Sequence, residues 1–110
     1  MYEIDYFINV FKILSYYYKT LKDGRRIFPE LLVSEGRLLP INYDYWRYIF
    51  NWLDADGYII MPAQIKNQIG DKLFDILRTT EITPSGIDYL LNDKNMKEAA
   101  EYITDWSYLK

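Results

Sequence analysis

The sequence predicts a mostly helical α+β fold with a two- or three-stranded β-sheet set among helices. Apolar residues recur at three- and four-residue spacing in three stretches, residues 4–21, 46–53 and 96–106, which is typical of amphipathic helices. A short β-prone run at residues 58–61 directly follows a glycine. A Thr-Pro pair at residues 83–84 then provides a helix start after a second apolar segment.

The first predicted helix runs from about Asp5 to Leu21. Its apolar stripe consists of Ile4, Phe7, Ile8, Phe11, Leu14, Tyr18 and Leu21. Gly24 is expected to cap its end in a left-handed conformation. Because the consecutive residues Tyr16, Tyr17 and Tyr18 cannot all face one side of a helix, at least one should be exposed or reach a neighbouring element.

A short strand at Arg25–Ile27 and a short helix at Phe28–Val33 are predicted next, and Pro29 is tolerated in a first helical turn. The clearest helix spans Asn42–Asp56. Asn42 is a good N-cap and Gly57 closes the helix. Its core stripe consists of Trp46, Ile49, Phe50 and Leu53.

Two strands separated by a loop are predicted after that helix. Tyr58–Met61 is the first strand, and residues 63–70 are polar and irregular. The latter part of residues 72–82 is interpreted as the second strand, although Leu73, Phe74 and Leu77 fit a helical turn equally well. The two strands with their loop would form a β-hairpin.

Two more helices complete the chain. Thr83 caps the first and Pro84 is its first residue, with an inner side of Ile87, Leu90 and Leu91. Asn92-Asp93 breaks it. The last helix runs from about Asn95 to Tyr108, and its stripe consists of Met96, Ala99, Ala100, Ile103 and Trp106.

This order of elements predicts the winged variant of the helix-turn-helix, in which the hairpin is the wing, with an added C-terminal helix. Residues 1–110 would form a single winged-helix domain, since no linker rich in Gly, Pro or Ser divides them. The run from Ile82 to Leu90, ITPSGIDYL, resembles the LTxxGxxYL run that leaves the wing in PadR-like and MarR-like regulators.

The chain as a whole resembles the YjcQ family, small winged-helix-like proteins of Gram-positive bacteria and their phages. The similarity rests on the first helix, the FLxxxGYI-like run at residues 52–59, the ITPSGIDYL run and a closing helix that ends in Trp106. The chain departs from the family in the Phe28–Leu39 stretch and in the wing loop. The resemblance implies a fold but no biochemical activity.

In a winged helix, the Asn42–Asp56 helix would be the recognition helix. Arg47, Tyr48 and Asn51 are therefore the candidates to face DNA bases, Arg47 and Asn51 by reading guanine and adenine. The helix has a net charge of −2, which is unfavourable near phosphates. The alternative is an ordinary solvated helix face.

Phosphate-facing cations are predicted at two places. The best basic cluster consists of Lys19, Lys22, Arg25 and Arg26, and the wing loop adds Lys66 and Lys72. Their partner would be double-stranded DNA. The alternative for the cluster is a solvated turn, and the alternative for the wing loop is a solvated hairpin tip. The net charge of −3 for the whole chain is unfavourable for binding nucleic acid.

Catalysis is not expected. The chain has no cysteine and no histidine, and no serine has a base to activate it. Asp54 and Asp56 are two apart on a helix, so they point in different directions and fit a helix-end role. We expect no metal and no cofactor. Because the sequence has no signal peptide or membrane-spanning run, we expect no membrane and a cytoplasmic location.

A protein partner is the alternative to DNA. Twelve tyrosines and three tryptophans exceed what a small core can bury, and both residue types are enriched in interfaces. The N- and C-terminal helices could form a homodimer, or they could pack on each other within one chain. The alternative function is a winged-helix protein–protein interaction module that does not bind DNA.

Overall fold

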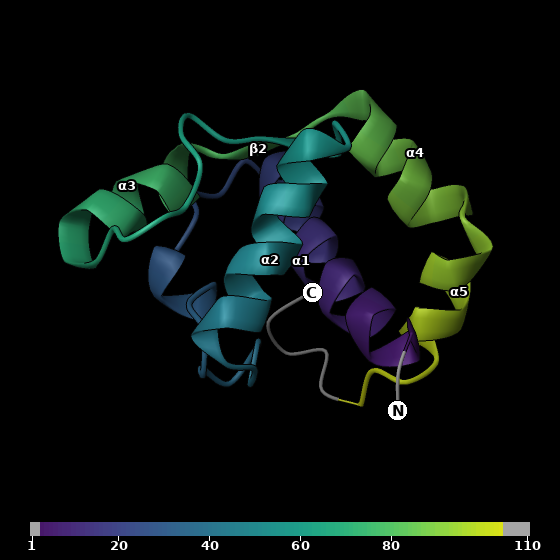
Figure 1. The fold of residues 1–110 in the computed structure, drawn as a ribbon. Helices are drawn as coiled ribbons and strands as arrows, with labels where there is room; N and C mark the ends of the chain where they lie inside the picture. The colour runs from purple at the N-terminus through teal and green to yellow at the C-terminus, as the bar shows by residue number, and fades with distance from the viewer. Residues whose placement is uncertain (1–2, 105–110) are drawn as a thin grey trace.

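The long helix α1 runs through the middle of the molecule (Figure 1). A computed structural model describes residues 3–104. Its elements are α1 (Glu3–Asp23), the 3₁₀ turn η1 (Pro29–Leu31), α2 (Tyr43–Ala55), β1 (Ile59–Ile60), α3 (Gly70–Thr79), β2 (Glu81–Ile82), α4 (Pro84–Asn92) and α5 (Lys94–Ala100). Helix α3 lies at one end of the molecule and helices α4 and α5 lie at the other, with α1 and α2 between them (Figure 1).

The sheet consists of two short antiparallel strands. Ile59 pairs with Ile82, and Ile60 pairs with Glu81. The predicted pairing between residues 58–61 and the segment before Thr83 is therefore confirmed. The predicted strand at Arg25–Ile27 is wrong, since these residues form a coil next to the end of α1.

The segment between the strands is a helix, which corrects the predicted hairpin. Helix α3 covers most of residues 72–82, and only Glu81 and Ile82 remain as the returning strand. Leu73, Ile76 and Leu77 are buried, and their spacing of three and four places them on one helical face. A strand would have placed Ile76 and Leu77 on opposite faces, so burial of both favours the helix.

The helix ends follow the predicted capping chemistry. The Asn42 side chain accepts a 2.9 Å hydrogen bond from the Tyr45 amide, and the Thr83 hydroxyl accepts one of 3.0 Å from the Gly86 amide. Gly24 and Gly57 follow α1 and α2 with φ of 67° and 80°, in the left-handed region that favours glycine. The predicted positions of three helices therefore rest on local chemistry.

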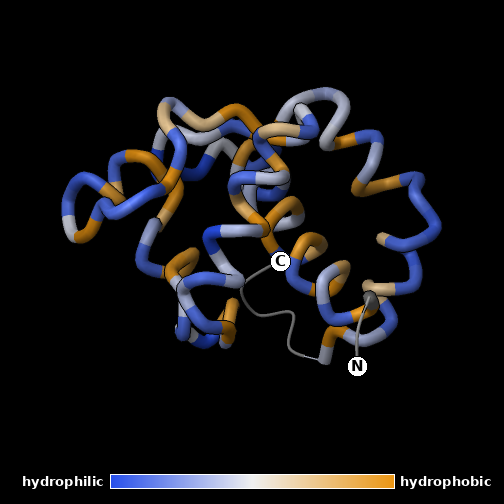
Figure 2. Tube along the Cα trace, in the orientation of Figure 1, coloured by the Kyte–Doolittle hydropathy of each residue, from blue (hydrophilic) through white to orange (hydrophobic). Residues whose placement is uncertain are grey.

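Helix α1 is buried on more sides than its predicted stripe implies. It contacts α4, α5 and β2. Val10 and Ile13 are buried although they lie outside the predicted stripe, whereas Leu21, inside it, is 61% exposed. Figure 2 shows hydrophobic residues along α1 and hydrophilic residues predominating on the outer side of α5. A helix enclosed by several elements has no single inner face.

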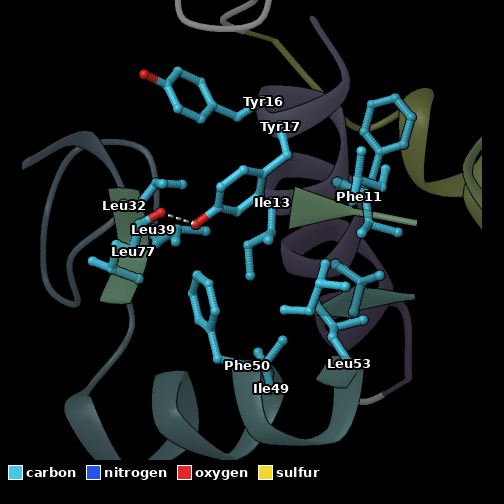
Figure 3. Close-up of a cluster of buried hydrophobic side chains, with 14 of the residues drawn as sticks. Phe11, Ile13, Tyr16, Tyr17, Leu32, Leu39, Ile49, Phe50, Leu53 and Leu77 are labelled. Carbon is cyan, nitrogen blue, oxygen red and sulfur yellow. Dashed lines mark hydrogen bonds between the residues drawn. The ribbon is translucent and has the colours of Figure 1, made fainter. Parts of the chain in front are cut away.

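Two of the three consecutive tyrosines are buried, each against a different segment. The hydroxyl of Tyr17 donates to the carbonyl oxygen of Leu77 at 2.8 Å (Figure 3). The hydroxyl oxygen of Tyr16 accepts a 2.9 Å hydrogen bond from the Phe28 amide. The expectation that a tyrosine of this triplet reaches a neighbouring element is therefore confirmed.

The terminal helices pack on each other within the chain, because α1 contacts both α5 and α4. Helix α5 ends at Ala100, earlier than predicted, and Ile103 is still buried after that end. The predicted end at Tyr108 and the stripe residue Trp106 lie outside the described residues. A homodimer through these helices stays a prediction. Among the described residues, no helix has the length and apolar character needed to cross a membrane.

Candidate nucleic-acid interface

The four cations of the predicted basic cluster lie at the end of α1 and in the turn that follows Gly24. Lys19 and Arg25 both approach the Asp23 carboxylate, at 3.9 and 3.2 Å. The Lys22 ammonium lies 5.1 Å from the centre of the Tyr18 ring, and the Arg26 guanidinium lies 5.3 Å from that of Phe28. The ring contacts hold Lys22 and Arg26 over a half-buried and an exposed ring, and both cations stay accessible to solvent.

A fifth cation, Arg78, reaches the same place from the end of α3. Arg25, Arg26 and Arg78 line one surface cavity of about 380 Å³, together with Glu81 and apolar residues that include Leu21. We call Lys19, Lys22, Arg25, Arg26 and Arg78 the basic end. Carboxylates beside these five cations include Asp23, Asp75 and Glu81, and Asp75 bonds Arg78 at 2.6 Å. The five cations outnumber these three carboxylates.

Sequence reasoning did not select Arg78, because that segment was interpreted as part of a strand. The spacing of Leu73, Ile76 and Leu77 was the signal that could have found it. Once these residues define a helix, Arg78 becomes a residue of its last turn, on the side away from the buried stripe.

Lys66 and Lys72 belong to a second place on the surface. Both line a depression of about 590 Å³ formed by residues 66–69, 71 and 72. Helix α3 begins beside this depression and ends at Thr79, one residue after Arg78, and its ten residues span about 15 Å. The six predicted phosphate-facing cations therefore fall into two groups, one near each end of α3.

Two of the three predicted base-facing residues, Arg47 and Asn51, lie on a flank of α2 that a loop partly covers. The Asn51 amide holds Ile65 with both of its polar atoms: its Oδ1 accepts from the Ile65 amide at 3.2 Å, and its Nδ2 donates to the Ile65 carbonyl at 3.1 Å. The Asp54 carboxylate accepts a 3.1 Å bond from the Met61 amide, and the Tyr43 hydroxyl donates to the Lys66 carbonyl at 2.8 Å. This flank therefore anchors the loop.

Arg47 lies on the same flank and is half-buried, whereas Tyr48 is 55% exposed on the neighbouring face. The structure thus places Arg47, Tyr48 and Asn51 in three different environments.

The most exposed face of α2 has a pattern that sequence reasoning missed. Asp44, Tyr48, Trp52 and Asp56 recur every four residues and are all exposed, and we call them the α2 stripe. Trp52 is 49% exposed, and its ring centre lies 6.3 Å from that of Tyr48. The spacing of four was visible in the sequence, but its exposure depends on which side of the helix faces the core.

The surroundings of this face are anionic and partly buried. Burial, followed by the Asp5 carboxylate, raises the pKa of Tyr45 to about 12. Burial also raises the pKa of Tyr6, with Asp56 as the next cause. Burial disfavours charge of either sign, so only the Asp5 and Asp56 carboxylates make the surroundings of this face unfavourable to an added anion.

Fold and surface together define a small, mostly helical α+β protein with a two-stranded antiparallel sheet and two surfaces of opposite charge. The chain belongs to the YjcQ family, because a family model described as YjcQ protein matches residues 11–106. This match confirms the resemblance seen in the sequence. The chain matches no curated protein and no solved structure.

Proposed function

We propose that the protein binds double-stranded DNA and that the basic end makes the principal phosphate contacts. The observation that carries the proposal is the convergence of Arg25, Arg26 and Arg78 on one cavity, from segments more than fifty residues apart in the chain. Arginine is suited to phosphate because its planar fork donates two parallel hydrogen bonds. Lys19 and Lys22, in the last turns of α1, widen the positive surface.

The proposed arrangement is a modified winged helix. Helix α2 would act as the recognition helix, since the paired strands β1 and β2 follow it in the chain, and α3 would replace the simple loop of a wing. Lys66 and Lys72, near the start of α3, would supply a second set of phosphate contacts. Duplex bound along α3 would therefore meet cations at both ends of this helix.

Base readout is a smaller part of this proposal than phosphate contact. Asn51 uses both of its amide atoms on Ile65, and the α2 stripe has a carboxylate at each end. Among the predicted base-facing residues, Arg47 keeps that proposed role as a minor contact, whereas Tyr48 belongs to the α2 stripe and is not assigned a contact with DNA. Binding should accordingly be strongly salt-dependent and weakly sequence-dependent.

Anisotropy with a labelled random 20-base-pair duplex tests the proposal at a series of salt concentrations. Three to four phosphate contacts predict a slope of log K against log salt of about −3 to −4. In the double variant Arg25→Glu with Arg26→Glu, binding should weaken for every sequence and the slope should flatten by about two.

The matched control is Lys94→Glu with Lys97→Glu, which changes the net charge equally at exposed positions of α5. It should bind duplex nearly as well as the wild type, because α5 lies at the opposite end of the molecule from α3 (Figure 1). Equal weakening in both double variants would show a response to net charge alone and would contradict the assigned surface.

A further inference from the structure

The α2 stripe has no partner within the described residues. Tyr48 and Trp52 present two adjacent aromatic rings to solvent, and neither Asp44 nor Asp56 forms an ion pair within residues 3–104. Single exposed apolar residues are common on protein surfaces, but two neighbouring aromatic rings between carboxylates form a chemically defined surface. Tyrosine and tryptophan are also the residues that contribute most to binding energy in protein interfaces.

The geometry points to a docking surface for a protein segment with an apolar centre and basic ends. Asp44 lies in the first turn of α2 and Asp56 directly follows its last residue, so they are about 18 Å apart along the axis and about 120° apart around it. An extended segment of about six to eight residues that crosses the helix obliquely covers this separation. Its terminal lysines or arginines would pair with the two carboxylates, and its centre would cover the rings of Tyr48 and Trp52.

Charge complementarity selects this occupant over the others. DNA would bring phosphates to a stripe with a carboxylate at each end, beside the carboxylates that raise the tyrosine pKa values. In a two-fold contact between copies, antiparallel α2 helices would place Asp44 of one copy against Asp56 of the other. Both arrangements set like charges together, whereas a basic segment removes the repulsion.

This surface is independent of the proposed DNA contacts. The α2 stripe shares no residue with the basic end, and the cavity of the basic end is formed by α1, α3 and β2 without α2. A variant in one surface can therefore be tested without altering the other.

Calorimetry with two synthetic peptides tests the inference. The first probe has two arginines at each end of four leucine and alanine residues, and in the second, glutamates replace the arginines. The arginine peptide should bind the wild type, and Tyr48→Ala with Trp52→Ala should weaken its binding by about tenfold or more. Asp44→Asn with Asp56→Asn should weaken binding and reduce its dependence on salt.

Exposed residues elsewhere provide the control. Tyr102→Ala with Asp88→Asn removes one aromatic ring and one carboxylate outside α2, and should leave the affinity unchanged. Three results would overturn the inference: no binding of the arginine peptide at millimolar concentration, equal binding of the two peptides, or equal weakening in the control. Self-association of the wild type that Trp52→Ala abolishes would also overturn it, in favour of a second copy.

Discussion

The hydroxyl of Tyr17 donates a 2.8 Å hydrogen bond to the carbonyl oxygen of Leu77, sixty residues later in the chain (Figure 3). Both residues are buried, and the bond joins the middle helix α1 to α3. Because α3 carries Arg78 one residue further on, this contact helps to fix the relative positions of the two segments that form the basic end. Burial raises the pKa of Tyr17, so the hydroxyl keeps its proton.

Tyr17→Phe removes only this hydroxyl and leaves the Leu77 carbonyl without its donor. We expect a loss of about 1 to 2 kcal/mol in the free energy of unfolding, measured by urea denaturation. Tyr18→Phe, at the adjacent half-buried position, is the matched control and should change stability by less than about 0.5 kcal/mol. Equal losses in the two variants would contradict the role assigned to the bond.

Gly86→Ala should destabilise the fold because helix α4 approaches the chain before β1 very closely. A Cβ atom at position 86 would lie 2.1 Å from the Tyr58 carbonyl oxygen and 2.9 Å from an Ile82 side-chain carbon. We expect a loss of about 2 kcal/mol or more in the free energy of unfolding. Ser85→Ala, next to it and exposed, should have little effect. A Gly86→Ala protein as stable as the wild type would contradict this packing.

Asn51→Ala should release the loop from α2, since it removes both hydrogen bonds to Ile65. Hydrogen exchange is the appropriate measurement, and the Ile65 amide should lose protection while the amides within α2 keep theirs. Asn67→Ala, in the exposed part of the same loop, is the control. Unchanged protection at Ile65 would show that Asn51 is not the anchor and would return it to the base-facing candidates.

Alkaline pH should destabilise the protein through Tyr45. Its folded-state pKa is raised to about 12, above the value near 10 of an unfolded tyrosine, so the folded state holds the proton more tightly. The contribution of Tyr45 to the free energy of unfolding is fully present below pH 10 and is lost as the pH rises to about 12. Tyr45→Phe should lose less stability than the wild type across this interval, as followed by urea denaturation at each pH.

Tyr102→Phe, at an exposed position, controls for the loss of a hydroxyl. An alkaline profile for Tyr45→Phe identical to that of the wild type would contradict the assignment, because other tyrosines would then account for the entire loss.

Local signals predicted α1, α2 and α4 well, but they missed α3 and the contacts between the helices. Asn42, Thr83 and Gly57 mark helix ends through bonds and backbone angles that involve only neighbouring residues, so sequence was sufficient for them. The segment with Leu73 and Leu77 fitted helix and strand equally, and only its packing on the core decides between them.

In the candidate site too, the features set by neighbouring residues were predicted from sequence, and those set by the fold were not. The cluster from Lys19 to Arg26 is contiguous in sequence and was found there, whereas Arg78 joins it only through the fold. Asn51 has the residue type and the helix position of a base-reading side chain. Sequence does not show that its amide is bonded to a loop fourteen residues later.

Chemical-shift mapping of the ¹⁵N-labelled protein during titration with random duplex tests the central claim most directly. DNA contact at the basic end predicts the largest amide shifts at residues 19–27 and 78–81, smaller ones at 66–72 and at Arg47, and little change elsewhere in residues 44–56. Largest shifts along α2, or shifts spread evenly over the molecule, would contradict the account.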